Sequence, residues 1–207
     1  MQEKGISVSS VQVQKDLATG INIVLIDAKG ERHFLTNPNS SLRKLDLADI
    51  QPFLHDTGEI VSFASMFVSP LMTIPKMKEL FSSIKEKEKI LAVDMTKAKN
   101  GERIEDIAEL LPFIDYIFPN EAEISLLTGE KDPYRNAQIL LEMGVKTAVI
   151  KCGERGCVLA DENGIRSIPA VPVARCVDTT GAGDTFVSGF LWALSEGWEA
   201  AECAKFA

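Results

Sequence analysis

Short apolar runs alternate with amphipathic segments through the middle of the chain. Four mostly apolar runs predict strands at 59–65, 89–95, 115–118 and 147–152. Between and beside them, apolar residues recur three and four positions apart, which predicts helices at 74–87, 103–111, 121–128 and 133–143. A hairpin at 157–160 and 165–168 and two closing helices are expected after that.

Strands that alternate with helices are typical of β-α-β units, whose parallel strands are covered on both faces. We therefore predict an α/β layered domain with a mostly parallel central sheet flanked by helices. Ligands of such sheets bind beyond the carboxyl ends of the strands. Met95, Asn120, Gly153 and Gly181 lie just past predicted strands or at turns, so they are expected to meet at one edge.

The first part of the chain follows a different pattern, with strand-like runs and no helical periodicity. Residues 7–14 alternate between apolar and polar, and the runs 21–27 and 32–36 flank a turn, which predicts a hairpin. Asp46 is placed to cap a short helix through residue 54. We therefore predict a small, mainly β appendage at 1–44 and an α/β core at 45–207.

Composition narrows the class of protein. The chain has 207 residues, is 45% hydrophobic and carries a net charge of −8, which disfavours binding to nucleic acid or to an anionic membrane. The four cysteines form no C-x-x-C pair and the two histidines lie far apart, so a structural zinc site is not expected. With no predicted leader or membrane span, we expect a soluble, cytoplasmic protein with buried free thiols.

The most informative stretch is a Gly-rich turn at 181–183, followed by Asp184 and a helical pattern. Such a turn leaves backbone N–H groups at the positive end of a helix dipole, an arrangement that binds phosphate. A plain turn with Asp184 as a helix cap is the alternative. The dinucleotide fingerprint fails because Phe186 occupies the position of its third glycine, and no Gly-Lys-Ser/Thr follows to make a Walker loop.

Three further positions have both a structural and a chemical interpretation. Asn120 followed by Glu123 matches a helix capping box, and the same two side chains would face Mg²⁺ on nucleotide phosphates. Lys151, with Gly153 and Gly156, either forms an ordinary hairpin or reaches phosphate groups. Asp94 ends a predicted strand, where it would cap, pair with a lysine or contact a substrate.

From Asp178 through Phe186 the sequence resembles the second signature of the ribokinase-like, PfkB-type carbohydrate kinases. Three other stretches agree in order and spacing, namely Thr19-Gly20 with 30–32, then 119–123, then 150–156. The resemblance extends along essentially the whole chain and implies a ribokinase-like fold. It implies an ATP-dependent sugar kinase that transfers the γ-phosphoryl group to a sugar hydroxyl.

The resemblance also implies roles at the Gly-rich turn. Asp184 would be the catalytic base, and Gly181, Ala182 and Gly183 would form the anion hole for the phosphoryl group in transfer. Asp178 and the backbone of Thr180 match positions that bind a monovalent cation, K⁺, in some members.

For the remaining motifs, the resemblance implies that Asn120 and Glu123 organise Mg²⁺ and phosphates. Lys151, Gly153 and Gly156 would bind the nucleotide. The β appendage would be a lid over the sugar and, as in several relatives, a contact of a homodimer.

The sequence departs from the family pattern at three places. The Gly-Gly first signature has no counterpart, the chain stops before the family's last helix, and Asp94-Met95-Thr96 replaces the commoner Asp-x-Asn, which puts the sugar contact of Asp94 in doubt. We therefore expect an internal or truncated portion of a longer kinase, one that folds poorly or is inactive alone. A nucleoside kinase of the same fold and an inactive nucleotide- or sugar-binding module stay as alternatives. A purely structural domain ranks last, because it leaves four motif matches to coincidence.

Overall fold

The structure is a computed structural model that describes residues 2–28, 32–172 and 179–207. The chain divides into two compact units. The first comprises Met1–Asp56 and Val68–Thr73, and the second comprises Thr57–Phe67 and Ile74–Ala207. The domain boundary expected at residues 44 and 45 stays a prediction.

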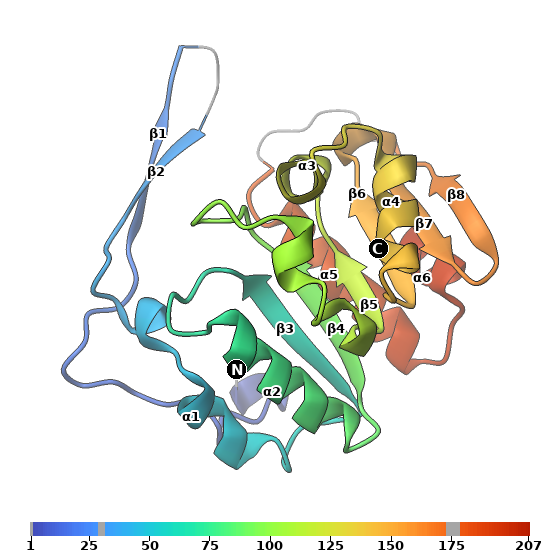
Figure 1. Cartoon of the computed structure of the whole chain (residues 1–207). Coiled ribbons are helices and arrows are strands. Elements are labelled where there is room, and N and C mark those ends of the chain that lie inside the picture. The colour runs from blue at the N-terminus through green and yellow to red at the C-terminus, as the bar shows by residue number, and fades with distance from the viewer. Residues whose placement is uncertain (1, 29–31, 173–178) are drawn as a thin grey trace. The chain divides into compact units, whose positions relative to one another are not determined.

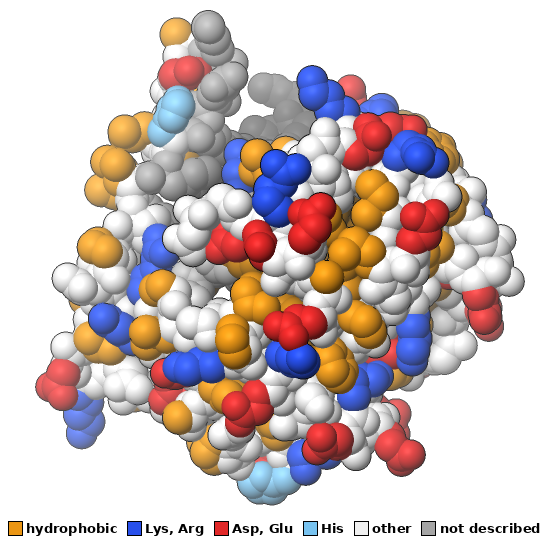
Figure 2. All heavy atoms as spheres, in the orientation of Figure 1, with side chains coloured by type: hydrophobic (Ala, Val, Ile, Leu, Met, Phe, Trp, Pro, Cys, Tyr) orange, Lys and Arg blue, Asp and Glu red, His pale blue; other side chains and the backbone are white. Residues whose placement is uncertain are grey.

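The first unit contains an antiparallel hairpin and short helical turns (Figure 1). β1 (Asn22–Ile26) pairs with β2 (Arg32–Thr36), as the sequence predicts. All five β1 side chains are exposed although four are apolar, and Figure 2 shows apolar side chains gathered along this strand. The helical elements of the unit are η1 (Gln2–Lys4), η2 (Ser41–Lys44), α1 (Leu47–Ile50) and η3 (Gln51–Phe53). The predicted cap is confirmed, because the Asp46 side chain accepts from the Leu47 N–H.

The strand expected at 7–14 is wrong. A turn interrupts this segment, with the Val11 N–H donating to the Val8 carbonyl at 3.0 Å. The hydroxyls of Ser7 and Ser9 lie 3.0 Å apart, and Ser7 Oγ accepts from the Ser9 N–H. Local serine hydrogen bonds of this kind compete with sheet pairing, so alternation of side chains alone did not produce a strand.

The second unit is built on one six-stranded sheet in the order β3-β4-β5-β6-β7-β8. β3 to β6 are parallel, and β7 runs antiparallel to both of its neighbours. The strands are β3 (Ile60–Met66), β4 (Ile90–Met95), β5 (Tyr116–Phe118), β6 (Thr147–Lys151), β7 (Cys157–Asp161) and β8 (Gly164–Ile168). The predicted mostly parallel sheet and its closing hairpin are therefore confirmed.

Helices cover both faces of this sheet. In Figure 1, α2 and α4 lie in front of the sheet and α5 and α6 lie behind it. The α helices of this unit are α2 (Ile74–Lys85), α3 (Glu121–Thr128), α4 (Pro133–Glu142), α5 (Ala182–Ser195) and α6 (Ala200–Phe206). Phe190 of α5 is fully buried, and its ring meets the rings of Tyr116 and Phe118 edge-on. None of the helices in the described ranges has the length and apolar character needed to cross a bilayer.

The helix expected at 103–111 is only partly correct. The chain forms two 3-10 helices instead of one α-helix, η4 (Ile104–Ile107) and η5 (Leu111–Phe113). Pro112 explains the break, because proline lacks an N–H and its ring collides with the carbonyl four residues earlier in an α-helix. The other short helix of the unit is η6 (Gly153–Arg155), which follows β6.

Asp115 ties the amino-end edge of the sheet together. Its Oδ2 accepts from Lys85 Nζ at 2.5 Å and from the Leu91 N–H at 2.8 Å, and its Oδ1 lies 2.6 Å from Lys146 Nζ. Burial of the carboxyl raises its pKa, but the hydrogen bonds from Lys146, Lys85 and Leu91 outweigh burial, so the pKa lies below its ordinary value of 3.8. One carboxylate thus links the end of α2 to the beginnings of β4, β5 and β6.

Asp115→Asn should lower the free energy of unfolding at pH 7 by about 2 kcal/mol, because it leaves two ammonium groups without their carboxylate. The folded-state pKa is depressed, so this contribution is present above pH 3.8 and is lost as the pH falls through the folded-state value. Urea denaturation of both proteins at pH 7 and near pH 3 measures the difference, which should shrink at the lower pH.

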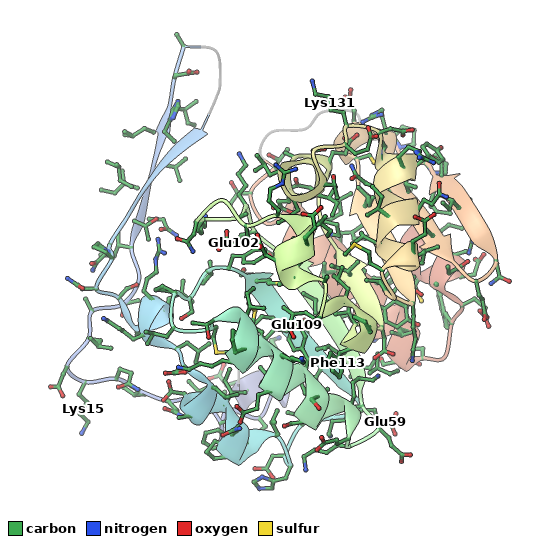
Figure 3. The ribbon with its side chains drawn as sticks, in the orientation of Figure 1. Lys15, Glu59, Glu102, Glu109, Phe113 and Lys131 are labelled. Carbon is green, nitrogen blue, oxygen red and sulfur yellow. The ribbon has the colours of Figure 1, made fainter. Side chains whose placement is uncertain are left out.

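Glu109→Gln is the matched control. Glu109, labelled in Figure 3, forms an exposed ion pair with Lys78 at 2.5 Å. Removing such a pair should change the free energy of unfolding by less than about 0.5 kcal/mol. Equal effects of the two substitutions would contradict a structural role for Asp115.

Candidate active site

The Gly-rich turn leads directly into α5. Gly181 is the N-cap residue with a φ of 78°, a left-handed conformation that glycine adopts without the cost of a side chain. The Ala182 N–H donates to the Thr179 carbonyl at 3.2 Å. Within the described parts of the chain, the N–H groups of Gly183 and Asp184 have no hydrogen-bond acceptor. The turn therefore presents two N–H groups at the positive end of a 14-residue helix.

Asp184 is the third residue of α5, and its side chain is exposed. Its backbone carbonyl accepts from Ser188 Oγ at 2.8 Å, while its carboxylate has no partner in the described ranges. The helix thus places an available proton acceptor next to two available N–H donors.

A second helix begins at the carboxyl edge of the sheet, immediately after β5. Asn120 caps α3 by accepting from the Glu123 N–H at 2.9 Å, and Glu123 Oε2 accepts from the Asn120 N–H at 2.8 Å. The capping interpretation is therefore confirmed. Glu123 Oε1 has no partner among the described residues, so this oxygen is available to a ligand.

Glu123 lies in a partly desolvated and charged setting. Burial raises the pKa of its carboxyl above the ordinary value, while the hydrogen bond from Asn120 and the charges of Lys151 and Lys97 act in the opposite direction. The charge of Asp94 adds to the rise. A carboxylate that is costly to ionise is more readily ionised when a further cation approaches it.

Lys151 connects the ends of three elements. It is the last residue of β6, and its Nζ donates to Asp94 Oδ1 at 2.7 Å from the end of β4. Both side chains are largely buried, with 15% of Lys151 and 12% of Asp94 exposed. A Cβ atom on Gly183 would lie 3.3 Å from Lys151 Nζ, so the ammonium sits against the first turn of α5.

A pocket of about 470 Å³ adjoins this ammonium. It brings together five of the predicted site residues, which are Lys151, Gly153, Gly156, Ala182 and Gly183. Its apolar wall includes Phe186 and Ala170. An apolar cavity with a cation and helix N–H groups at one end suits a ligand that carries phosphate on an aromatic or sugar body.

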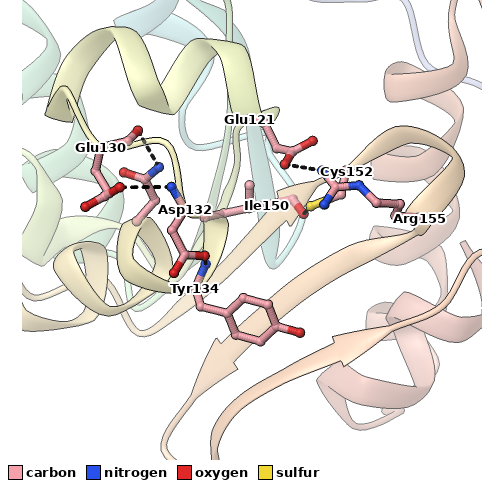
Figure 4. A network of polar contacts seen from close by, with 8 residues as sticks. Glu121, Glu130, Asp132, Tyr134, Ile150, Cys152 and Arg155 are labelled. Carbon is pink, nitrogen blue, oxygen red and sulfur yellow. Dashed lines mark hydrogen bonds and ion pairs between the residues drawn. The ribbon is translucent and has the colours of Figure 1, made fainter.

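The loop after β6 is anchored to α3. Arg155 Nη2 donates to Glu121 Oε1, an ion pair drawn in Figure 4, and this hydrogen bond raises the pKa of Arg155. Cys152 precedes the loop and donates through Sγ to the Ile150 carbonyl at 3.3 Å. The ion pair holds Gly153–Arg155 close to the beginning of α3.

The two glycines of this loop differ in their surroundings. A Cβ on Gly156 would lie 2.0 Å from the Ile168 carbonyl oxygen and 2.5 Å from the Ala170 nitrogen. A Cβ on Gly153 would meet no atom within 4 Å. Gly156 is therefore required by the close approach of the chain that follows β8, whatever its contact with a nucleotide, whereas Gly153 leaves open space beside the pocket.

The predicted K⁺ and Mg²⁺ sites differ in how much of each lies within the described residues. Asp178 lies outside the described residues, and Thr180 lies just before the N-cap of α5. Over the described ranges, no three His, Cys, Asp or Glu side chains come together to hold a metal. Asn120 and the free Glu123 oxygen nevertheless fit Mg²⁺, which keeps most of its waters and takes one or two carboxylates together with substrate phosphates.

Sequence reasoning missed how Asp94, Lys151 and Lys97 are related. Lys97 follows Asp94 by three residues, is exposed, and acts on the Glu123 carboxylate by its charge. The available signal was the position of each residue at or just past a parallel strand, because such strand ends meet at one edge of a sheet. The pairing of Asp94 with a lysine was among the alternatives, but its partner 57 positions away was not predicted.

The sequence profile described as "pfkB family carbohydrate kinase" matches residues 1–207. The chain belongs to the pfkB family of carbohydrate kinases. An "uncharacterized sugar kinase" of Archaeoglobus fulgidus is 28% identical over 99% of the chain and 79% of its own length. A cytidine kinase of Thermococcus kodakarensis is 35% identical over 64% of the chain and 49% of its own length.

Solved structures share this fold. The protein titled "Sa239" superposes with a TM-score of 0.79 at 25% identity, over 99% of this chain and 66% of that protein. A putative ribokinase II from E. coli, in complex with ATP and Mg²⁺, gives a TM-score of 0.75 at 25% identity over 91% of this chain and 62% of its own length. The chain thus spans slightly less than two thirds of these solved proteins.

Gly156→Ala should lower the free energy of unfolding by about 3 kcal/mol, because its Cβ would collide with backbone atoms at a φ of 90°. Gly153→Ala, at a φ of 60° with open space around it, should cost only about 1 kcal/mol of backbone strain. Denaturant unfolding of both variants measures the two values. Equal losses would show that the contact with the chain after β8 is unimportant.

Proposed function

We propose that this chain carries the phosphoryl-transfer site of an ATP-dependent sugar kinase. The observation that carries the proposal is the position of the Lys151 ammonium against the N-terminus of α5, where both line one pocket. The backbone of Lys151 is also bridged to Asn120, the N-cap of α3. Cations and helix N-termini both favour phosphate, and the pocket is large enough for a nucleoside. The pfkB relatives that bind or act on ATP and sugars support the assignment.

In the proposed reaction, the oxygen of a sugar hydroxyl attacks the γ-phosphorus of ATP. The bond from γ-phosphorus to the bridging oxygen breaks, ADP leaves, and Asp184 receives the hydroxyl proton. The turn Gly181-Ala182-Gly183 is proposed as the anion hole, as expected from the sequence. Because the Ala182 N–H donates to the Thr179 carbonyl, the N–H groups proposed to bind the phosphoryl oxygens are those of Gly183 and of the next residue, Asp184. Phosphoryl transfer needs positioning and charge compensation more than a strong base, so an exposed carboxylate is sufficient.

Nucleotide and metal contacts complete the proposal. Lys151 binds phosphate oxygens, Gly153 lets the nucleotide approach the backbone, and Gly156 shapes the same loop. Glu123 and Asn120 would hold Mg²⁺ through water, and the ion would supply charge neutralisation for the ATP phosphates. Asp178 and Thr180 are proposed to hold K⁺, and activity that is unchanged when tetramethylammonium replaces K⁺ would refute this. Location in the cytoplasm stays a prediction.

A nucleoside kinase is the second candidate. It is favoured by the cytidine kinase relative, which is 35% identical over 64% of the chain. Both candidates use the same transfer site and differ only in the acceptor hydroxyl. A panel of acceptors therefore separates them.

Asp184→Asn should lower kcat by about 10²- to 10⁴-fold, because it removes the proton acceptor while keeping the shape of the side chain. ADP release with ATP–Mg²⁺ is measured across a panel of sugars, sugar acids and nucleosides, together with ATP affinity. Affinity should change little, since the backbone N–H groups stay in place.

Glu196→Gln is the control, because it removes one exposed carboxylate from the other end of α5. It should leave kcat unchanged. Transfer to sugars supports the leading candidate, and transfer to nucleosides alone supports the second. Transfer that persists in Asp184→Asn would refute the assignment of the base.

We also propose that the β1–β2 hairpin joins two copies of the chain. An isolated two-stranded hairpin is marginally stable in water, and this one exposes Ile23, Leu25 and Leu35 by 50–57% on one face. An exposed apolar strand of this kind is a surface for protein association. A second copy offers the same apolar surface and therefore fits it.

Replacing Ile23 and Leu25 by glutamate should convert a dimer into a monomer, because like charges would face each other across the joined hairpins. Sedimentation equilibrium at several protein concentrations measures the mass. Leu126→Glu, which adds a charge at an exposed apolar position of α3, is the control and should leave the mass unchanged. A monomeric wild-type protein would contradict the proposal.

A further inference from the structure

The ion pair between Lys151 and Asp94 spans two strand positions. Lys151 ends β6, Asp94 lies near the end of β4, and β5 runs between them in the sheet. Neighbouring strands are about 4.8 Å apart, so the two backbones are separated by about 10 Å at this edge. Only a long side chain closes that distance, and the extended Lys151 side chain reaches Asp94 Oδ1 at 2.7 Å.

This position of the ammonium is electrostatically unfavourable without a carboxylate. The group is largely buried, and it lies against Gly183 in the first turn of α5, where the helix dipole is positive. The backbone of Lys151 is also bridged to Asn120, the N-cap of α3, so a second helix N-terminus is close. Asp94 supplies the carboxylate that is hydrogen-bonded to the ammonium, and the charge of Glu123 also acts on it.

The Asp94 carboxylate is poorly accessible to bulk solvent and to an approaching ligand. Its residue is 9% exposed, and Oδ1 is occupied by Lys151. An ammonium has three donors, so Lys151 keeps two N–H bonds for other acceptors while the third is held by Asp94. The ion pair therefore fixes the position of the ammonium and leaves its other two N–H groups available to acceptors.

We propose that Asp94 is a positioning residue that holds the Lys151 ammonium beside Gly183, where it meets a phosphate group bound at the N-terminus of α5. The role rests on the proposed kinase function for its kinetic consequence, but not for the placement of the ammonium. It assigns Asp94 to the phosphate side of the site rather than to the sugar. Direct contact of Asp94 with the acceptor is the competing outcome.

The placement of the ammonium is tested without any activity. An amine-acylating reagent with mass-spectrometric readout should modify Lys151 slowly, because reaction requires the ammonium to lose its proton and leave the carboxylate. Asp94→Asn should raise the rate at Lys151 about fivefold, since the amine is no longer held against a carboxylate and can turn toward the reagent. Lys131, which projects into solvent in Figure 3, sets the rate for an exposed amine.

Lys85 is the internal control for loosening of the whole fold. It is 27% exposed and paired with Asp115 at the opposite edge of the same sheet. A rise at Lys151 alone supports the proposal. An equal rise at Lys85 would show that Asp94→Asn only destabilises the protein, and an unchanged Lys151 would show that Asp94 does not hold the ammonium. Either of these two results overturns the proposal.

The kinetic consequence is tested by a double-mutant cycle with Asp94→Asn and Lys151→Met. Asp94→Asn should lower kcat about 10- to 100-fold with little change in the KM of the acceptor, because a displaced cation no longer meets the phosphoryl group in transfer. In the Lys151→Met protein the same substitution should have almost no further effect. Additive losses together with a raised acceptor KM would overturn the proposal in favour of a sugar contact.

The two arms separate this inference from the proposed function. If the wild-type protein transfers phosphate to no acceptor, the kinase proposal fails while acylation still decides the placement of the ammonium. Binding of inorganic tripolyphosphate, measured by calorimetry, supplies the further readout in that case. Both substitutions should raise the dissociation constant of tripolyphosphate, and the increase caused by Asp94→Asn should be severalfold smaller than that caused by Lys151→Met. An equal or larger increase in Asp94→Asn would contradict a role exerted through Lys151.

Discussion

The edge of the sheet at which β4, β5 and β6 end depends on one ion pair, between Lys151 and Asp94. It crosses the end of β5 and brings an ammonium against the first turn of α5. At the opposite edge, Asp115 binds Lys85 and Lys146 around the beginnings of the same strands. The parallel strands are thus tied by charges at both ends, and the tie at the carboxyl end is the one that faces a pocket.

The sequence predicted the fold wherever local and tertiary preferences agreed. Buried parallel strands are almost wholly apolar, so β4 and β6 were evident from composition alone. Asn120 and Asp46 marked helix beginnings because their side chains accept from local N–H groups in the structure. Prediction failed at 7–14, where serine hydrogen bonds replaced sheet pairing, and at 103–111, where Pro112 prevents a continuous α-helix.

The candidate site was predicted in its residues but not in their pairings. The turn before α5 was recognisable because few structural requirements explain two glycines and an aspartate together. The partner of Asp94 was not, because local sequence carries no information about which of several strand ends supplies a lysine. Nor did the sequence distinguish Gly153 from Gly156, since the approach of the Ile168 carbonyl depends on how the chain leaves β8.

The glycines of the turn serve two physical requirements that happen to favour the same residue. Gly181 must adopt a positive φ to begin α5, a requirement that exists with or without a ligand. Gly183 has helical backbone angles, and a side chain there would be disfavoured for another reason. Its Cβ would lie only 3.3 Å from the Lys151 ammonium. Neither constraint applies to Ala182, which is consistent with its being the one residue of the three that carries a side chain. Glycine at 181 therefore follows from the way the helix begins, while glycine at 183 avoids a close contact with the Lys151 ammonium. A bound phosphate would use both the helix beginning and the ammonium.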